Sequence, residues 1–415
     1  MNSPRPIDTP GSADASAPLK VGFLYNHDEL HQVAHTAPII SALQRQYPSI
    51  TVEILSSSEA QTEAVKRHLD PALPEPKIHA LKRSKALSFA EKLIGSAAPL
   101  GRIGFLTANR DLLGSYDALV VPETTTTLLK TKLGLTDTRL IHIPHGAGDR
   151  SICVSPDIAH FDFVMLPGEK TRARMLESRV VREGASAVVG YPKFDSRTAT
   201  GETPIFDNDR PTVFYNPHFD PKLSSWFKFG IPMLEYFANQ DRYNLIVAPH
   251  VMLFRRKVLA SVEHRVMKIR KAIPDRFKSL DHIHIDEGSL NSVDMTYTRM
   301  ADVYVGDVSS QVYEFIERPR PAIFLNSHDA DWRNDESYFF WNFGPVVDDF
   351  ADFEAALNLP AAEQAAYAKR QAEIFADAID IKADARSSHR AADAIADFLN
   401  REFPDRAVRK EASNV

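Results

Sequence analysis

Short apolar segments alternate with stretches of helical pattern along most of this chain, and this alternation limits the possible folds more than any other feature. Six segments of strand length lie in the first half, with helical patterns between them: residues 20–25, 51–55, 116–122, 139–143, 163–166 and 187–189. Strands and helices that alternate in this way predict a parallel sheet covered by helices on both faces. The first half is therefore expected to form a doubly wound α/β domain.

A break in the pattern separates two such halves. Residues 198–211 read TATGETPIFDNDRP, a mixture of Gly, Pro, Thr and Asp that is typical of a linker. The alternation then restarts, with strands expected at 212–215, 244–248, 282–285, 302–305 and 322–325 and a helix at 258–272. The predicted organisation is a tail (1–18), an N-terminal domain (19–198), a linker (199–211), a C-terminal domain (212–360), C-terminal helices (361–403) that can pack back on the N-terminal domain, and a second tail (404–415).

Composition excludes several classes of protein. Of the 415 residues, 44% are hydrophobic and 25% are charged, as in ordinary globular proteins. The formal net charge of −6 argues against a nucleic-acid partner. No apolar run approaches the roughly 20 residues that cross a bilayer, and the first residues lack the apolar core of a secretory signal. The single cysteine, Cys153, excludes an intrachain disulfide.

Residues 301–326 (ADVYVGDVSSQVYEFIERPRPAIFLN) are the most informative stretch for function. They predict a strand, a tight turn and a helix that begins near Ser309, so that Asp307, Ser309 and Ser310 lie at the helix start. Unpaired N–H groups and a partial positive charge at that position suit a phosphate. Glu314, about one turn further on, is placed to accept hydrogen bonds from a ribose. The stretch predicts a nucleotide-diphosphate site at the carboxyl end of a parallel sheet, although an ordinary capped helix would give the same pattern.

Three histidines follow predicted strands. His145 begins a loop with Gly146 and Gly148, where the backbone can approach a ligand closely. An imidazole there can accept a proton near neutral pH, although a solvated histidine on a turn is the alternative. His250 follows the strand at 244–248 and is expected to point into the cleft and hydrogen-bond a diphosphate, unless it only caps the strand. His218 follows the strand at 212–215 and suits either a phosphate contact or a hinge.

Other polar clusters are less specific. Residues 80–104 form a basic amphipathic pattern that could lie on an anionic membrane or face the core, and Arg255, Arg256 and Lys257 leave the same choice. The histidines at 27, 31 and 35 spread over two helical turns, too far apart for a tetrahedral zinc site. We therefore predict no metal and no cofactor. Lys193, in the turn GYPKFD, can reach a phosphate or only mark a change of chain direction.

These motifs resemble the CDP-glycerol glycerophosphotransferase family, which builds teichoic-acid-like glycerol phosphate polymers. The resemblance covers roughly residues 140–330. It rests on His145-Gly146, on Gly190, Pro192 and Asp195, on Tyr215 and Pro217, on His250, and on Asp307, Ser309, Ser310 and Glu314.

The resemblance implies a GT-B fold, in which two doubly wound Rossmann-like domains face a cleft, with the acceptor on the first and the nucleotide donor on the second. It also implies transfer of phosphoglycerol from CDP-glycerol to a glycan or lipid hydroxyl during bacterial cell-envelope biosynthesis. His145 would be the base, and the protein would be cytoplasmic or peripheral on the inner face of the membrane. Two alternatives stay open: a glycosyltransferase or epimerase of the same fold that acts on a UDP-sugar, and a non-catalytic binding protein.

Overall fold

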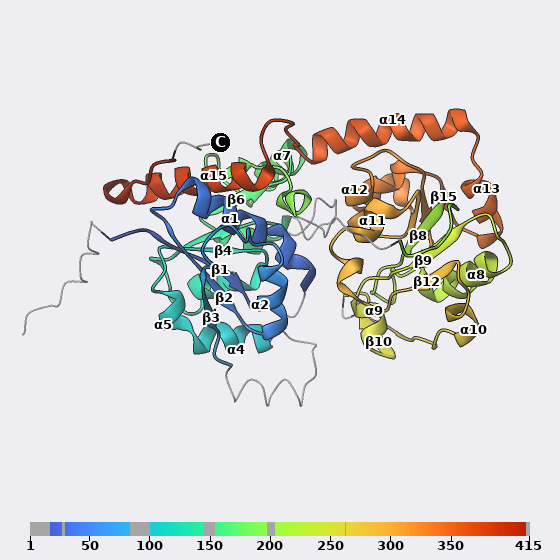
Figure 1. Cartoon of the computed structure of the whole chain (residues 1–415), viewed down its shortest axis with the longest axis horizontal. Coiled ribbons are helices and arrows are strands. Elements are labelled where there is room, and N and C mark those ends of the chain that lie inside the picture. Colours follow the sequence, from blue (N-terminus) through green and yellow to red (C-terminus); the bar gives the residue numbers. More distant parts are fainter. Residues whose placement is uncertain are drawn as a thin grey trace, which may run out of the picture.

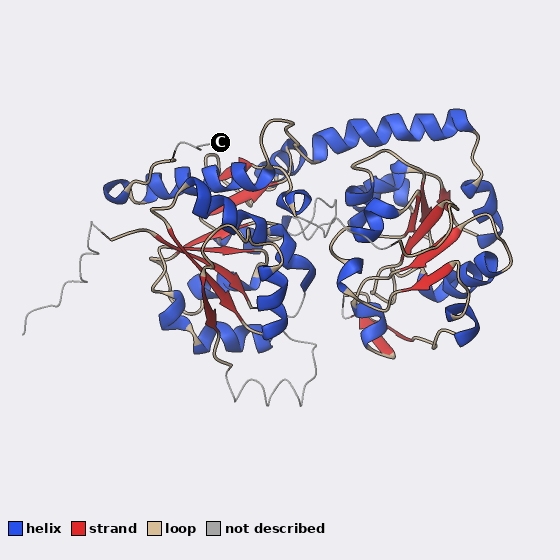
Figure 2. Ribbon diagram, viewed as in Figure 1, coloured by secondary structure: helices blue, strands red, loops and turns tan. Residues whose placement is uncertain are grey.

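The computed structural model describes residues 17–26, 30–83, 100–144, 154–196, 204–261 and 263–411. It contains two α/β units, each built around one parallel sheet (Figures 1 and 2). The predicted fold class is confirmed: both sheets are doubly wound and Rossmann-like.

The N-terminal sheet has seven strands in the order β3-β2-β1-β4-β5-β6-β7, and every pairing is parallel. The strand order reverses between β1 and β4. Strand β3 was missed by the sequence analysis because its four residues are only partly buried and carry no apolar run. The strands are β1 (Lys20–Tyr25), β2 (Thr51–Ser56), β3 (Lys77–Ala80), β4 (Ala118–Val121), β5 (Arg139–His142), β6 (Phe163–Leu166) and β7 (Ser186–Val188).

Helices cover both faces of this sheet. One face packs against α1, α2 and the C-terminal helix α15, and the opposite face packs against α4, α5, α6 and α7. The helical elements are η1 (Leu30–His35), α1 (Ala37–Gln46), α2 (Glu59–Lys66), α4 (Leu100–Ala108), α5 (Arg110–Leu113), η2 (Thr125–Thr127), α6 (Leu128–Thr131), η4 (Pro156–His160), α7 (Glu169–Glu177) and η5 (Pro192–Asp195).

The C-terminal sheet has six parallel strands in the order β12-β9-β8-β13-β14-β15, which reverses between β8 and β13. The strands are β8 (Thr212–Asn216), β9 (Asn244–Val247), β12 (Ile283–Ile285), β13 (Val303–Gly306), β14 (Ala322–Leu325) and β15 (Val346–Val347). One face packs against α8, α9, α10 and α13, and the other against α11, α12, η8 and α14.

The helical elements of this unit are α8 (Trp226–Ala238), α9 (Met252–Arg255), α10 (Asp275–Lys278), η6 (Leu290–Ser292), α11 (Thr296–Met300), α12 (Gln311–Phe315), η7 (Trp332–Asn334), η8 (Glu336–Phe343), η9 (Phe350–Asp352) and α13 (Phe353–Leu357).

The predicted helix at 258–272 is wrong. That segment contains an antiparallel hairpin of β10 (Val258–Ser261) and β11 (Val266–Ile269). Burial alternates along β10, with Leu259 and Ser261 covered and their neighbours exposed, so the period is two and not 3.6.

The last two long helices divide between the units (Figure 1). Helix α14 (Ala361–Ala378) lies on the C-terminal unit, where Gln371 donates to the carbonyl oxygens of Arg320 and Phe343, each at 2.8 Å. The chain then crosses to the N-terminal unit, where α15 (Ser387–Glu402) packs on α1 and ends near η10 (Pro404–Arg406). The chain therefore passes between the units twice, once before β8 and once between α14 and α15. Within the described residues, no helix has both the length and the apolarity to span a bilayer.

Candidate functional site

The loops that carry His218, His250 and Asp307 meet at one edge of the C-terminal sheet. They follow β8, β9 and β13, which lie side by side and run parallel, so their carboxyl ends share that edge. The strand order reverses between β8 and β13, and loops diverge at such a point and leave a crevice for a ligand. The structure thus brings three of the predicted residues to the position where an open α/β sheet binds its ligand.

Asp307 holds this edge together from inside. Its carboxylate is fully buried and accepts hydrogen bonds from the backbone N–H groups of His218 (2.9 Å), Ser225 (2.6 Å) and Val308 (2.6 Å). Burial raises the pKa of Asp307, and these hydrogen bonds oppose the rise. The predicted ligand contact of Asp307 is corrected on this point: its oxygens are occupied, and its role is to join the loop after β8 to the loop after β13.

His218 and His250 lie near each other at this edge. Their ring centroids are 5.7 Å apart, and Phe219 lies 4.5 Å and 4.7 Å from them. Nδ1 of His218 accepts a hydrogen bond from Asp220 N (3.1 Å), and Nδ1 of His250 accepts one from Met252 N (3.3 Å). A neutral imidazole that accepts on Nδ1 carries its proton on Nε2. In the neutral form both rings therefore carry their proton on Nε2.

Backbone N–H groups supply two further donors. Among the described residues, neither the N–H of Ser309 nor that of Ser310 has an acceptor. The Ser309 side chain is buried, whereas Ser310 is exposed and precedes α12 without a side-chain capping bond. Helix α12 begins at Gln311, two residues later than predicted, and has only five residues. An anion there would therefore be held by adjacent N–H groups more than by a long helix dipole.

Glu314 faces the N-terminal unit. Its Oε1 lies 2.6 Å from Nζ of Lys193, and both side chains are almost fully buried. Burial raises the pKa of Glu314, and the Lys193 ammonium opposes the rise. Oε2 is buried and has no hydrogen-bond partner. Of the two oxygens predicted to bind a ribose, one is therefore committed to an ion pair and only the other is without a partner.

Two predicted residues, His145 and Gly146, lie outside the described residues. The described chain reaches Pro144, just after β5, and resumes at Val154. Among the described residues, no group of three or more His, Cys, Asp or Glu side chains is arranged to hold a metal ion.

The sequence analysis missed a polar cluster at the end of β12. The Asp286 carboxylate accepts hydrogen bonds from Gly288 N (2.8 Å), Ser289 N (2.7 Å) and the Tyr297 hydroxyl (2.6 Å). Burial opposes ionisation of Asp286, but these hydrogen bonds prevail and lower its pKa. An acidic residue directly after a short strand, followed two residues later by glycine, was the signal that could have located it.

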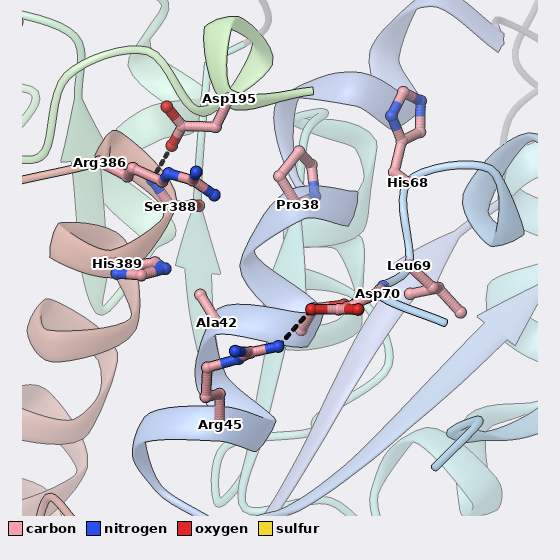
Figure 3. A pocket seen from close by; sticks show the side chains of 11 residues that line it. Pro38, Ala42, Arg45, His68, Leu69, Asp70, Asp195, Arg386, Ser388 and His389 are labelled. Carbon is pink, nitrogen blue, oxygen red and sulfur yellow. Dashed lines mark hydrogen bonds and ion pairs between the residues drawn. The ribbon is translucent and has the colours of Figure 1, made fainter. Parts of the chain in front are cut away.

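A separate cavity lies in the N-terminal unit between α1 and the start of α15, with a volume of about 460 Å³ (Figure 3). Its charged side chains are largely paired: Arg45 with Asp70, and Asp195 with the backbone N–H of Ser388. None of the predicted site residues lines it. The cavity therefore contributes no residue to the edge of the C-terminal sheet described above.

Two doubly wound units, with polar loops at the carboxyl edge of the second, define the GT-B class of fold. A putative UDP-N-acetylglucosamine 2-epimerase from Listeria monocytogenes has a TM-score of 0.59 at 14% identity, over 96% of this chain and 100% of that one. The wall teichoic acid polymerase TagF has a TM-score of 0.58 at 12% identity, over 93% of this chain and 89% of that one.

A third solved structure is similar over nearly the whole chain. It is the UDP-GlcNAc 2-epimerase from Neisseria meningitidis bound to UDP-GlcNAc, with a TM-score of 0.54 at 12% identity, over 92% of this chain and 99% of that one. No family model and no curated protein matches the sequence. At these identities the likeness establishes the GT-B fold, which the sequence resemblance had implied.

Proposed function

We propose that this protein is a transferase that moves phosphoglycerol, or a related group, from a CDP-linked donor to a hydroxyl of a glycan or lipid acceptor. The observation that carries the proposal is the convergence of His218, His250 and the N–H groups of Ser309 and Ser310 at the strand-order reversal. The sequence motifs of the glycerophosphotransferases and the solved structures of TagF, two of which were soaked with CDPG, support the choice of donor.

Four donors at this edge match the chemistry of a diphosphate. A diphosphate presents several anionic oxygens, and each needs an N–H or O–H donor once water is displaced. The two imidazoles would donate through Nε2 and the two serine residues through their backbone N–H groups. Glu314 would accept a hydrogen bond from a ribose hydroxyl on Oε2, the oxygen without a partner.

The chemical step would be an in-line displacement at the β-phosphorus. His145 would take the proton of the acceptor hydroxyl, and the acceptor oxygen would bond to the phosphorus. The bond from that phosphorus to the bridging oxygen would break, and its electron pair would leave with CMP. The donors on the diphosphate would stabilise the growing charge, typically by about 3 kcal/mol for each well-placed donor. Closure of the two units would exclude water, which otherwise hydrolyses the donor.

A second function has specific support. Two of the similar structures are UDP-GlcNAc 2-epimerases, and their TM-scores are close to that of TagF. The same four donors could hold the diphosphate of a UDP-sugar. In that case the reaction would occur at a carbon of the sugar, and the edge would serve only to bind the nucleotide.

Incubation of the purified protein with CDP-glycerol or with UDP-GlcNAc, each with candidate acceptors, separates these functions. The proposal is supported if CMP is released from CDP-glycerol in the presence of an acceptor and UDP-GlcNAc does not react. Formation of UDP or of an epimerised sugar from UDP-GlcNAc supports the second function, and no reaction with either supports a non-catalytic binding protein. We expect His250→Ala to weaken nucleotide binding about tenfold or more, as loss of a charge-assisted hydrogen bond does. His160→Ala, at an exposed histidine in η4, is the matched control.

A further inference from the structure

The β10–β11 hairpin has one face that nothing in the described chain covers. Its register pairs Val258 with Ile269 and Ala260 with Met267, so these four side chains project from the same face. Val258 is 48% exposed, Met267 70% and Ile269 71%, which places all three among the most exposed large apolar side chains of the described chain. Exposed apolar side chains gathered on one element mark an interaction surface more often than chance.

The opposite face anchors the hairpin. Leu259 belongs to the core on the α8 side of the C-terminal sheet. The Lys268 ammonium lies 4.9 Å from the ring centroid of Phe227, and the Arg270 guanidinium lies 4.4 Å from that of Phe254. The hairpin is therefore fixed to the body of the unit through one face and presents the other outward. In Figure 1 it lies at the lower edge of the C-terminal unit, on the side opposite α14.

The hairpin is strongly basic in a chain whose net charge is −6. Its two strands and flanking residues carry one acidic side chain, Glu263, and seven basic ones: Arg255, Arg256, Lys257, Arg265, Lys268, Arg270 and Lys271. Apart from Lys268 and Arg270, these cations are exposed at the ends of the strands. Among the described residues, none of the exposed five forms an ion pair. These five exposed cations form a basic rim at the ends of the two strands, next to the apolar face.

An anionic lipid bilayer is the partner that suits both features. The acyl boundary accepts Val258, Met267 and Ile269, and the anionic headgroups meet the basic rim. A nucleic acid would satisfy only the charges, because the outer face has no aromatic ring on which a base could stack. A second copy would bury the apolar face but would bring two rims of the same sign together.

We propose that the outer face of the β10–β11 hairpin docks the protein on anionic membrane surfaces, with Val258, Met267 and Ile269 entering the interface and the basic rim contacting headgroups. The proposal does not depend on the donor or on the reaction. It places the C-terminal unit against the lipid, so that a lipid-linked acceptor would be presented at a defined orientation.

The test is flotation of the full-length protein with vesicles of phosphatidylcholine alone and of phosphatidylcholine mixed with phosphatidylglycerol. We expect binding only to the mixed vesicles, and weaker binding at high salt. The double variant R255Q/R256Q should bind them about 25-fold more weakly, at about fivefold for each charge near the surface. The variant M267S/I269S should lose roughly tenfold or more, because each buried methylene contributes to partition.

Matched controls keep the result specific. K369Q/R370Q removes two charges from the exposed side of α14, and Ile381→Ser removes an apolar side chain that is 46% exposed elsewhere. Both controls should bind like the unchanged protein, and all variants should keep its thermal unfolding midpoint. The proposal fails if the unchanged protein does not float with mixed vesicles, or if the hairpin variants float as well as the controls do. It also fails if M267S/I269S abolishes a vesicle-free dimer, which would make this face a self-association surface.

Discussion

At the scale of single residues, the sheet edge that carries His218, His250 and Asp307, which we propose binds a nucleotide, depends on backbone groups as much as on side chains. Asp307 takes up three N–H groups and so decides which amides remain for a ligand, namely those of Ser309 and Ser310. The serine hydroxyls attracted attention in the sequence, but the Ser309 hydroxyl oxygen already accepts from Gln311 N at 3.4 Å. The residue type at these positions matters less than the N–H that any residue except proline provides.

Ser310→Pro tests this distinction. The φ of Ser310 is −67°, a value that proline adopts, so the substitution removes the N–H with little change in this backbone angle. We expect CDP-glycerol to bind about 10- to 100-fold more weakly, since a hydrogen bond to a charged group contributes about 1.5–3 kcal/mol. Ser310→Ala keeps the N–H and should bind nearly as well as the unchanged protein. Isothermal titration of both variants checks the argument, and equal affinities would remove the amide from the site.

At the scale of elements, the parallel strands were predictable and the short helices were not. Strands such as β1 and β13 are continuous apolar runs buried on both faces, and the sequence shows such runs directly. Helix α12 has only five residues, and a helix of little more than one turn leaves no periodic pattern in the sequence that would show where it begins. The hairpin at β10–β11 was mistaken for a helix because its basic and apolar residues alternate over too few positions to separate a period of two from one of 3.6.

The turn before η5 has an element-scale role that the motif alone did not reveal. Gly190 has a φ of +83°, and a Cβ added there would lie 2.7 Å from the Asp380 carbonyl oxygen and would also collide with Ser387 Oγ. Asp195, at the other end of the turn, accepts from Ser388 N at the start of α15. The segment GYPKFD therefore contacts the start of α15 at both of its ends and helps to hold this helix against the N-terminal unit.

Gly190→Ala should destabilise the protein by about 1–3 kcal/mol in urea unfolding, from the cost of a left-handed alanine together with the close contact. Gly184→Ala is the control, because Gly184 has a φ of +77° but nothing lies within 4 Å of the added Cβ. It should show only the backbone cost, about 1 kcal/mol. If the two variants lose the same stability, the close contact of Gly190 with Asp380 and Ser387 contributes nothing to the stability of the protein.

At the scale of the whole molecule, charged groups near the boundary couple the two units. His68 follows α2 in the N-terminal unit, and the charge of Asp294 in the C-terminal unit acts to raise its pKa. Burial is the main cause that lowers the pKa of His68 to about 4, while Asp294 opposes the shift and Lys193 adds to it. In the unfolded chain a histidine has a pKa of about 6.5.

This shift predicts a dependence of stability on pH. Between pH of about 6.5 and about 4 the unfolded chain binds a proton that folded His68 does not, so stability falls as the pH falls through this window. The thermal unfolding midpoint, followed from pH 7 to pH 4, should decrease less in His68→Gln than in the unchanged protein. His160→Gln, at the exposed histidine, should leave the profile unchanged, and an unchanged profile in His68→Gln as well would contradict the assignment.

The ion pair of Lys193 and Glu314 is the strongest candidate for coupling the two units. Lys193 lies in η5 of the N-terminal unit and Glu314 in α12 of the C-terminal unit, with side chains 3% and 5% exposed. Lys193→Met would leave Glu314 charged, buried and without its partner, and loss of one partner of a buried pair typically costs about 3–5 kcal/mol. The double variant K193M/E314Q removes both charges and should recover most of that loss.

The exposed pair of Lys369 and Glu373, 4.0 Å apart, gives the matched control, since K369M should cost less than about 1 kcal/mol. Urea unfolding of the unchanged protein, K193M, E314Q and K193M/E314Q yields the coupling energy of the pair. Small-angle scattering shows whether K193M separates the units. If K193M and K369M cost the same, the buried pair does not stabilise the contact between the two units.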